Sequence, residues 1–292
     1  MINDSLSKVR ALARKLTGEA GSRRYKVGVA FSGGGSRGFA HCGALLALEN
    51  AGIRPQIVAG VSAGSVVSTL YAAGMRPQQI VEIFTGFGFT DFVEFKGIHN
   101  GGIFSLLPFG KFIEKAAKVQ RLEDLEMTNV VCASDFDNGQ PKQFRSGRIK
   151  DIIAASCCIP ILFNPVVIDG VRYVDGGVLR NLPAWPIRKE CDLLIGVNCS
   201  PLTSQASKSS ITSNAFRTYQ LMAKTNVAED MAMCDFTVNI TEIAHQKTFD
   251  LDNIRTTVKA GYDAMAEALR NVGIMPLSPD SPPAETDRLS NK

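Results

Sequence analysis

A serine enclosed by glycines is the feature of the sequence that most clearly suggests chemistry. Within VAGVSAGSVVSTL, residues 58–70, Ser62 occupies the pattern Gly60-Val61-Ser62-Ala63-Gly64. This Gly-x-Ser-x-Gly spacing is typical of a nucleophile elbow, a tight strand-to-helix turn that lifts a serine oxygen out of a sheet. A serine hydroxyl becomes a good nucleophile only when a nearby base accepts its proton. The pattern therefore predicts a nucleophile at Ser62 and a base elsewhere in the chain.

A glycine-rich segment lies one strand earlier, in SGGGSRGFAHCGAL, residues 32–45. Gly33, Gly35 and Gly38 match the Gly-x-Gly-x-x-Gly fingerprint of dinucleotide-binding folds. That fingerprint expects an acid at the end of the next strand to hold a ribose, and Ser62 stands there instead. Backbone N–H groups without side chains can stabilise the negative oxygen of an acyl-transfer intermediate. We therefore predict an oxyanion hole at Gly33, Gly34 and Gly35, with dinucleotide binding, testable by titration with NAD, as the alternative.

The base is less obvious, because the chain has only three histidines, His41, His99 and His245. The order serine, acid, histidine makes His245 an admissible base, with Asp175 or Asp192 as the intervening acid. None of the three histidines stands in a distinguishing local pattern. A histidine base is therefore open on the residues alone, but it has no motif to support it.

Asp175 is the stronger candidate for the base. In RYVDGGVLRNLP, residues 172–183, it ends an expected strand, and Gly176 and Gly177 allow a sharp turn. In open α/β sheets, sites assemble beyond the carboxyl ends of the strands, where this carboxylate would project. The alternative is that Asp175 only initiates the turn, as we expect of Asp169 and Asp137.

The composition is that of a folded protein without a nucleic-acid surface. The chain has 292 residues, of which 45% are hydrophobic, enough to bury a full core. The formal net charge is +4, and Lys and Arg are spread along the chain, which gives no support for nucleic-acid binding. Seven cysteines without a repeating spacing fit reduced thiols, and the adjacent Cys157 and Cys158 lack the partners of a zinc site. We expect neither a metal nor another cofactor.

The chain divides into three expected parts. Residues 1–24 form a basic amphipathic segment that could lie on an anionic membrane surface or pack on the domain. Residues 25–274 are expected to form a single domain, and 275–292 have too little apolar content to order. The serine-rich stretch 200–213 predicts a mobile loop before a helix over 214–233. Because no secretory or membrane-spanning stretch is visible, we expect a cytoplasmic protein, with peripheral contact at the inner membrane surface as an option.

Strand and helix patterns alternate along the chain. Strands are predicted at 26–31, 56–60, 129–136, 142–146, 165–170, 171–177, 193–198 and 236–240. Helices are predicted at 38–50 and 63–73, each closed by a glycine. The dipeptides Asn138-Gly139 and Asp169-Gly170 predict hairpins. Together these patterns predict an α/β fold with a mixed sheet and helices on both faces.

The glycine-rich segment SGGGSRGFAHCGAL, the elbow GVSAGS and the turn VDGG resemble, in order and spacing, the three motifs of patatin-like phospholipases. The block ASCCIP, residues 155–160, is also similar to a family segment. The resemblance covers roughly residues 26–200 and looks like the bacterial single-domain branch. It implies a three-layer α/β/α fold with a mixed, mainly parallel central sheet, and the activity of a lipid acyl hydrolase.

The resemblance also implies roles for the motif residues. It implies a serine–aspartate dyad without histidine, with Ser62 as the nucleophile and Asp175 as the base. It assigns the oxyanion loop to Gly33, Gly34 and Gly35. Arg37 would either order that loop or meet an anionic head group. The motif glycines expected to support the site are Gly38, Gly60, Gly64, Gly176 and Gly177.

A phenylalanine-rich stretch suggests the substrate class. Residues 84–112 contain eight of the 16 phenylalanines of the chain. Aromatic side chains beside glycines suggest a mobile apolar wall for a fatty acyl chain, with about half of them in ordinary packing. We therefore expect a lipid-like acyl ester as substrate, such as a phospholipid or lysophospholipid. The alternative is a regulatory or scaffold protein with weak or partner-activated hydrolysis, whose partner the sequence does not identify.

Overall fold

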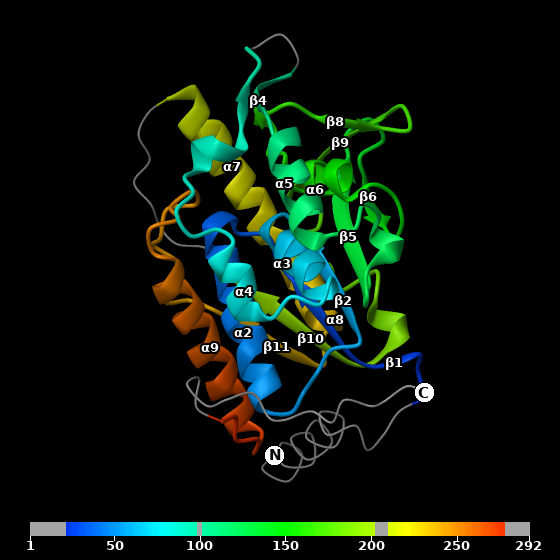
Figure 1. Ribbon diagram of the computed structural model, residues 1–292, viewed down its shortest axis with the longest axis vertical. Coiled ribbons are helices and arrows are strands. Elements are labelled where there is room, and N and C mark those ends of the chain that lie inside the picture. Colours follow the sequence, from blue (N-terminus) through cyan, green and yellow to red (C-terminus); the bar gives the residue numbers. More distant parts are fainter. Residues whose placement is uncertain (1–21, 98–100, 202–209, 278–292) are drawn as a thin grey trace.

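The computed structural model describes residues 22–97, 101–201 and 210–277 of the chain. Its centre is a mixed sheet with strand order β11-β10-β1-β2-β5-β9-β8, and β6 also pairs with β5 (Figure 1). The strands are β1 (Tyr25–Phe31), β2 (Ile57–Val61), β5 (Thr128–Asp135), β6 (Gln140–Phe144), β8 (Val166–Ile168), β9 (Val171–Asp175), β10 (Cys191–Asn198) and β11 (Phe236–Asn239). Neighbours from β11 to β5 are parallel, while β6, β8 and β9 make antiparallel pairs. The predicted mixed, mainly parallel sheet is confirmed.

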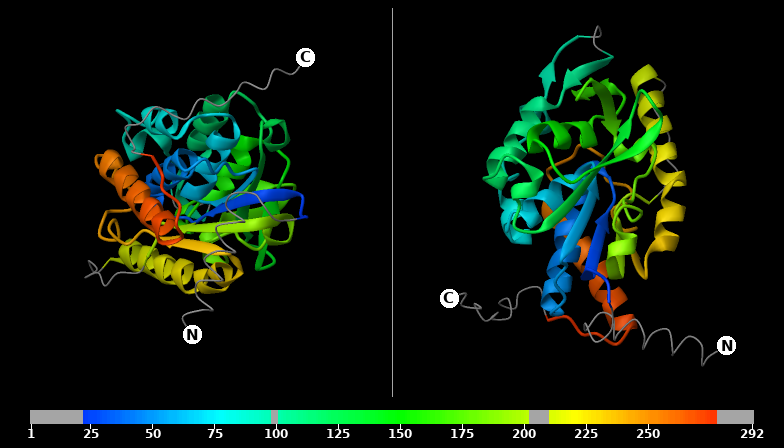
Figure 2. Two further views of the ribbon diagram at one scale, coloured as in Figure 1. Left: turned by 90° about the horizontal axis from the view of Figure 1, so that it is seen from below. Right: turned by 90° about the vertical axis from the view of Figure 1, so that its right-hand side faces the viewer.

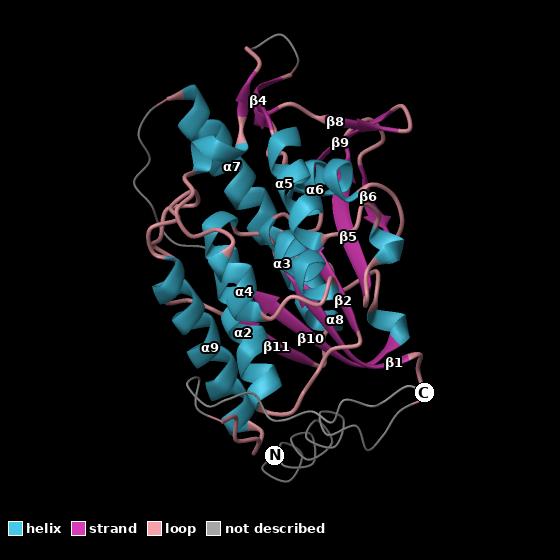
Figure 3. Ribbon diagram, viewed as in Figure 1, coloured by secondary structure: helices cyan, strands magenta, loops and turns pink. Residues whose placement is uncertain are grey.

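Helices cover both faces of this sheet, which confirms the predicted three-layer architecture (Figure 3). The helices are α2 (Phe39–Asn50), α3 (Ala63–Ala72), α4 (Pro77–Glu82), α5 (Leu107–Ala117), α6 (Ile149–Cys157), α7 (Ile211–Thr225), α8 (Val227–Met233) and α9 (Ile254–Asn271). One core lies between the sheet and α2, α3 and α9, and a smaller one lies beneath α8. In the right-hand view of Figure 2, α5 and α7 lie on opposite sides of the sheet.

The central strands follow the logic of a parallel sheet that is buried on both faces. All five residues of β2 are buried. In β2, Val58 belongs to the larger core, whereas Ile57 and Ala59 belong to the smaller one. Strands that face a core on each side need apolar residues at every position, so the short runs of apolar sequence were sufficient to predict them. Both predicted hairpins are also present, as β5–β6 and β8–β9.

A second, smaller sheet was not predicted. It has the order β3-β4-β7, with strands β3 (Glu94–Phe95), β4 (Gly102–Ser105) and β7 (Ile161–Phe163). Its register sets Phe95 opposite Phe104 and Phe104 opposite Phe163. Strands of two to four residues from distant parts of the chain carry no periodicity of their own, so only the tertiary structure defines them.

The prediction of one helix over 214–233 was wrong. Helix α7 begins at Ile211, where Ser210 accepts a hydrogen bond from the Ser213 N–H at 3.1 Å. The chain then breaks at Asn226 into α7 and α8. The side chain of Asn226 accepts from the Asn181 N–H and donates to the carbonyl oxygen of Gly177. These contacts with distant residues fix the break, and local helical spacing does not report them.

Several expectations fall on residues that the structure does not describe. They are the amphipathic segment before residue 22, the centre of the serine-rich loop, the tail after residue 277 and His99. Within the described ranges, no helix is both long and apolar enough to cross a membrane. All seven cysteines carry free thiols.

Candidate active site

The Ser62 turn has the geometry of a strand-to-helix elbow. Ser62 follows β2 directly and begins α3 with φ 52° and ψ −125°, a conformation that side chains other than glycine rarely adopt. A Cβ atom on Gly60 would lie 2.3 Å from the carbonyl oxygen of Gly64. A Cβ atom on Gly64 would lie 2.3 Å from the carbonyl oxygen of Phe31. The two motif glycines are therefore needed because the elbow packs backbone against backbone.

Ser156 holds this strained turn in place. Its hydroxyl accepts a hydrogen bond from the Ser62 N–H at 2.9 Å and donates to the carbonyl oxygen of Cys132 at 2.7 Å. Ser156 is fully buried at the end of α6, so it links the elbow to β5 without exposure to water. The Ser65 hydroxyl adds a hydrogen bond of 2.6 Å to the carbonyl oxygen of Ser62. The sequence signal for Ser156 was its place in the ASCCIP block, although its role was not predicted.

Asp175 ends β9 and is fully buried. Its Oδ1 accepts the Gly177 N–H at 2.8 Å, whereas Oδ2 has no well-formed hydrogen bond. Burial raises the pKa of Asp175 to about 6, and looser hydrogen bonds from the hydroxyls of Ser62 and Tyr219 moderate the increase. Catalytic hydrogen bonds are often poorly aligned before substrate binds, so the loose approach of Ser62 is compatible with proton transfer. A buried carboxylate with a raised pKa beside a serine is a candidate general base.

Tyr219 and Asn181 are site residues that the sequence analysis missed. The Tyr219 hydroxyl lies against the Asp-Gly-Gly turn, 2.6 Å from the position of a Cβ on Gly177. Asn181 is buried between this turn and the glycine loop, and neither polar atom of its side chain has a hydrogen-bond partner. Its place six residues after Asp175 was a weak signal. Tyr219 had none, because α7 comes from a distant part of the chain.

The glycine loop meets the elbow, but its three glycines are not equivalent. The N–H of Gly33 already donates to the carbonyl oxygen of Asn181 at 3.1 Å, so its predicted use as an oxyanion donor conflicts with this conformation. The N–H groups of Gly34 and Gly35 have no hydrogen-bond partner among the described residues. Gly35 adopts φ 61°, and a Cβ there would lie 2.2 Å from the carbonyl oxygen of Thr248. Of the three loop glycines, Gly34 and Gly35 are therefore the candidates for oxyanion donors.

Arg37 lies beneath the loop, where it is only 6% exposed. Its Nε donates to the carbonyl oxygen of Gly34 at 3.1 Å, and its Nη2 donates to the Ser200 hydroxyl at 3.3 Å. Of the two expected roles of Arg37, these contacts support the ordering of the loop and not contact with a head group. At the end of the loop, a Cβ on Gly38 would lie 2.4 Å from the Cβ of Ala63, so this glycine lets α2 approach the elbow closely.

Neither of the two histidines that the structure describes makes a hydrogen bond with Ser62 or Asp175. His41 is fully buried, and its Nε2 lies 2.8 Å from the carbonyl oxygen of Ser32 and 3.3 Å from the Sγ of Cys199. His245 is exposed in a turn after β11. The geometry therefore offers Asp175, and neither histidine, as the group that faces Ser62.

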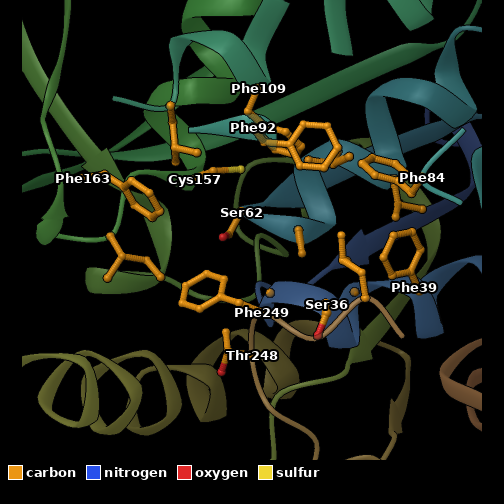
Figure 4. A pocket seen from close by; sticks show the side chains of 18 residues that line it. Ser36, Phe39, Ser62, Phe84, Phe92, Phe109, Cys157, Phe163, Thr248 and Phe249 are labelled. Carbon is orange, nitrogen blue, oxygen red and sulfur yellow. The ribbon is translucent and has the colours of Figure 1, made fainter. Parts of the chain in front are cut away.

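An apolar pocket of about 120 Å³ opens at Ser62. Its walls carry the phenylalanines that Figure 4 shows around the serine: Phe39, Phe84, Phe92, Phe109, Phe163 and Phe249. Only Phe84, Phe92 and Phe109 belong to the predicted stretch 84–112. Phe87 and Phe95 of that stretch are 43% and 71% exposed. The predicted aromatic wall is therefore only part of the pocket lining, and the other phenylalanines come from distant parts of the chain.

One N–H group that a dinucleotide fingerprint would offer to a phosphate is already bonded within the chain. The Ser36 N–H, at the start of the helix, donates to the carbonyl oxygen of Thr248 at 2.7 Å. A dinucleotide fingerprint requires such N–H groups to be free for phosphate oxygens. The geometry therefore disfavours the dinucleotide alternative. Among the described residues, no group of three or more His, Cys, Asp or Glu side chains could hold a metal ion.

Comparisons with known proteins point to one family. A family model for patatin-like phospholipases matches residues 29–187. The YqhO protein of Bacillus subtilis is 31% identical over 231 residues, which are 67% of this chain and 78% of that protein. Lysophospholipase NTE1 of Kluyveromyces lactis is 29% identical over 202 residues, which are 64% of this chain but only 13% of the yeast protein. The crystal structure of VipD from Legionella pneumophila is similar in fold, with a TM-score of 0.56 at 16% identity over 86% of this chain and 67% of that chain.

Proposed function

The chain belongs to the patatin-like phospholipase family, a family of carboxylic ester hydrolases, and from this premise we propose that it hydrolyses lipid acyl esters with a Ser62–Asp175 dyad. The observation that carries the proposal is the meeting of three features at one place. The strained Ser62 faces a buried carboxylate and opens onto an apolar pocket. It also lies against the glycine loop, in which the N–H groups of Gly34 and Gly35 have no hydrogen-bond partner among the described residues.

The proposed first step is acylation of Ser62. Asp175 accepts the hydroxyl proton while the Ser62 oxygen attacks the ester carbonyl carbon. The carbonyl oxygen becomes negative, and the N–H groups of Gly34 and Gly35 stabilise it. The intermediate then collapses, the bond to the alcohol oxygen breaks, and the proton on Asp175 passes to the leaving alcohol. The products are an acyl-enzyme and a free alcohol.

The second step returns the enzyme to its starting state. Asp175, ionised again, takes a proton from a water molecule that attacks the acyl carbon, and the same two N–H groups stabilise the new oxyanion. Collapse releases the fatty acid and gives Ser62 its proton back through Asp175. One buried carboxylate therefore acts as base and acid in turn, and its pKa of about 6 suits both roles.

The lining of the pocket supports a lipid acyl chain as the group transferred to Ser62. Aromatic and aliphatic side chains bind a hydrocarbon chain by removing it from water, at about 0.8 kcal/mol for each buried CH₂ group. The similarity to a yeast lysophospholipase points in the same direction. A glycerol-based phospholipid or lysophospholipid is thus the proposed substrate class.

The test is hydrolysis of a series of p-nitrophenyl esters of increasing acyl length, with a fluorophosphonate probe for Ser62 in parallel. Ser62→Ala and Asp175→Asn should each abolish turnover, and Ser62→Ala should also lose labelling. His245→Ala is the matched control and should keep wild-type rates. Equal loss in a folded His245→Ala variant would overturn the dyad. A wild-type protein that neither turns over nor labels would overturn the hydrolase and favour the scaffold alternative.

A further inference from the structure

A second groove lies beside the apolar pocket at Ser62, which we call the acyl pocket, and has a volume of about 210 Å³. One side is formed by the segment around β7, residues 159–162, and the other by the first turns of α7, with Ala215 and Phe216. Phe249 closes the end, where its ring centroid lies 5.7 Å from that of Phe216. We call this space, lined by residues 159–162, Ser213, Ala215, Phe216 and Phe249, the outer groove.

The outer groove shares two walls with the acyl pocket. Ile159 and Phe249 line both spaces, so a single layer of side chains separates them. In Figure 4, Phe249 lies next to Ser62, which places this shared wall beside the reacting serine. A molecule that branches into two chains close to Ser62 could therefore place one chain in each space.

The rim of the groove is held in a strained conformation. Ile161 lines the groove, is 51% exposed, and adopts φ 73°, in the left-handed region that β-branched residues avoid. Such strain costs on the order of 1–3 kcal/mol and persists where the surrounding structure imposes it, often at ligand clamps. Pairing of β7 with Gly102 in β4 holds Ile161 in this position. An exposed isoleucine at this point gains contacts only when an apolar group enters the groove.

We propose that the outer groove binds the second acyl chain of a diacyl lipid, while the acyl pocket holds the chain whose ester is cleaved. This inference rests on the proposed hydrolase function and deepens its substrate class. In a diacylglycerol-based lipid the two esters are attached to neighbouring carbon atoms, so the chains can part on either side of a thin wall. A single-chain lipid leaves the groove and its exposed isoleucine without a partner. The structure thus assigns a diacyl lipid as the preferred substrate.

The first experiment compares dihexanoyl phosphatidylcholine with hexanoyl lysophosphatidylcholine, both as monomers below their micelle concentrations, so that membrane binding does not contribute. Wild type should have a higher kcat/KM for the diacyl substrate. Ala215→Trp fills the groove and should lower the ratio of diacyl to single-chain kcat/KM about tenfold or more, because excluding two methylenes of the second chain, at about 0.8 kcal/mol each, already corresponds to about tenfold. Thr218→Trp, on the exposed part of the same helix, is the matched control and should leave the ratio unchanged.

A second variant protects the test against misfolding of Ala215→Trp. Ile161→Gly removes the rim side chain and relieves the positive φ, so it should fold at least as well as wild type. Ile161→Gly should also lower the ratio of diacyl to single-chain kcat/KM by several-fold. If both variants change the two substrates equally, or if wild type does not prefer the diacyl substrate, the second-chain site is wrong while the hydrolase proposal stands. If wild type does not hydrolyse even p-nitrophenyl hexanoate, the hydrolase proposal itself fails.

Discussion

Replacement of the buried base should make the protein inactive but more stable, and the gain should depend on pH. Burial raises the pKa of Asp175 from 3.8 to about 6. A raised acid pKa means that the folded state binds the proton more tightly than the unfolded state, so stability falls as pH rises from about 4 through about 6. At 1.36 kcal/mol per pKa unit, the penalty above pH 6 is about 3 kcal/mol. Asp175→Asn removes this titration and keeps an acceptor for the Gly177 N–H.

The assay is urea denaturation of wild type and Asp175→Asn at several pH values between 4.5 and 8. The stability advantage of the variant should grow with pH by roughly 2–3 kcal/mol and level off above about pH 7. Asp137→Asn is the control, because the exposed Asp137 has a pKa lowered by its hydrogen bonds with Arg172. Its linkage has the opposite sign and is complete once pH exceeds about 4, so any stability lost in Asp137→Asn should be constant between pH 4.5 and 8. A pH-independent difference for Asp175→Asn would refute the reasoning.

Three further predictions concern activity. Tyr219→Phe removes a hydroxyl that lowers the pKa of Asp175, so the acid limb of the kcat/KM profile, expected near pH 6, should move to higher pH; an unmoved limb would assign Tyr219 to packing alone. Gly34→Ala would place a Cβ 2.5 Å from the Sγ of Cys199 and should lower kcat by about 10²-fold or more, with partial rescue by Cys199→Ala in the double variant. Phe92→Ala should shift the preferred p-nitrophenyl ester to longer acyl chains, because Phe92 lines the acyl pocket; an unchanged chain-length profile would contradict its place in the wall.

Local backbone demands explain why much of the fold and the strand-to-helix turn at Ser62 could be predicted. At Gly60 and Gly64, any side chain would collide with backbone atoms, so only glycine fits, and the glycine pattern is visible in the sequence. The same applies to Gly176, where a Cβ would lie 2.7 Å from the carbonyl oxygen of Cys132, whereas at Gly177 the nearest atoms belong to side chains. Strands buried on both faces must be apolar throughout, which made most of the central sheet visible as short hydrophobic runs.

Features that depend on contacts between distant segments could not be predicted. The N–H of Gly33 is taken by Asn181, a contact that no pattern around Gly33 reports. The acyl pocket closes with Phe163 and Phe249, which lie far along the chain from the phenylalanine-rich stretch. The break between α7 and α8 depends on the hydrogen bonds of Asn226 with the Asp-Gly-Gly turn region. In each case a side chain or a carbonyl oxygen from another element decides the outcome.

Burial can supply the base strength that a histidine would otherwise provide. A free aspartate with a pKa near 3.9 is a poor base at neutral pH, whereas free histidine has a pKa near 6.5. Burial raises the pKa of Asp175 to about 6, which is close to the pKa of free histidine. A histidine base needs a third residue to orient its ring, but the carboxylate of Asp175 is oriented by the Gly177 N–H of its own turn. The proposed dyad therefore needs no third member, and its cost is the folding stability lost by keeping a charge away from water.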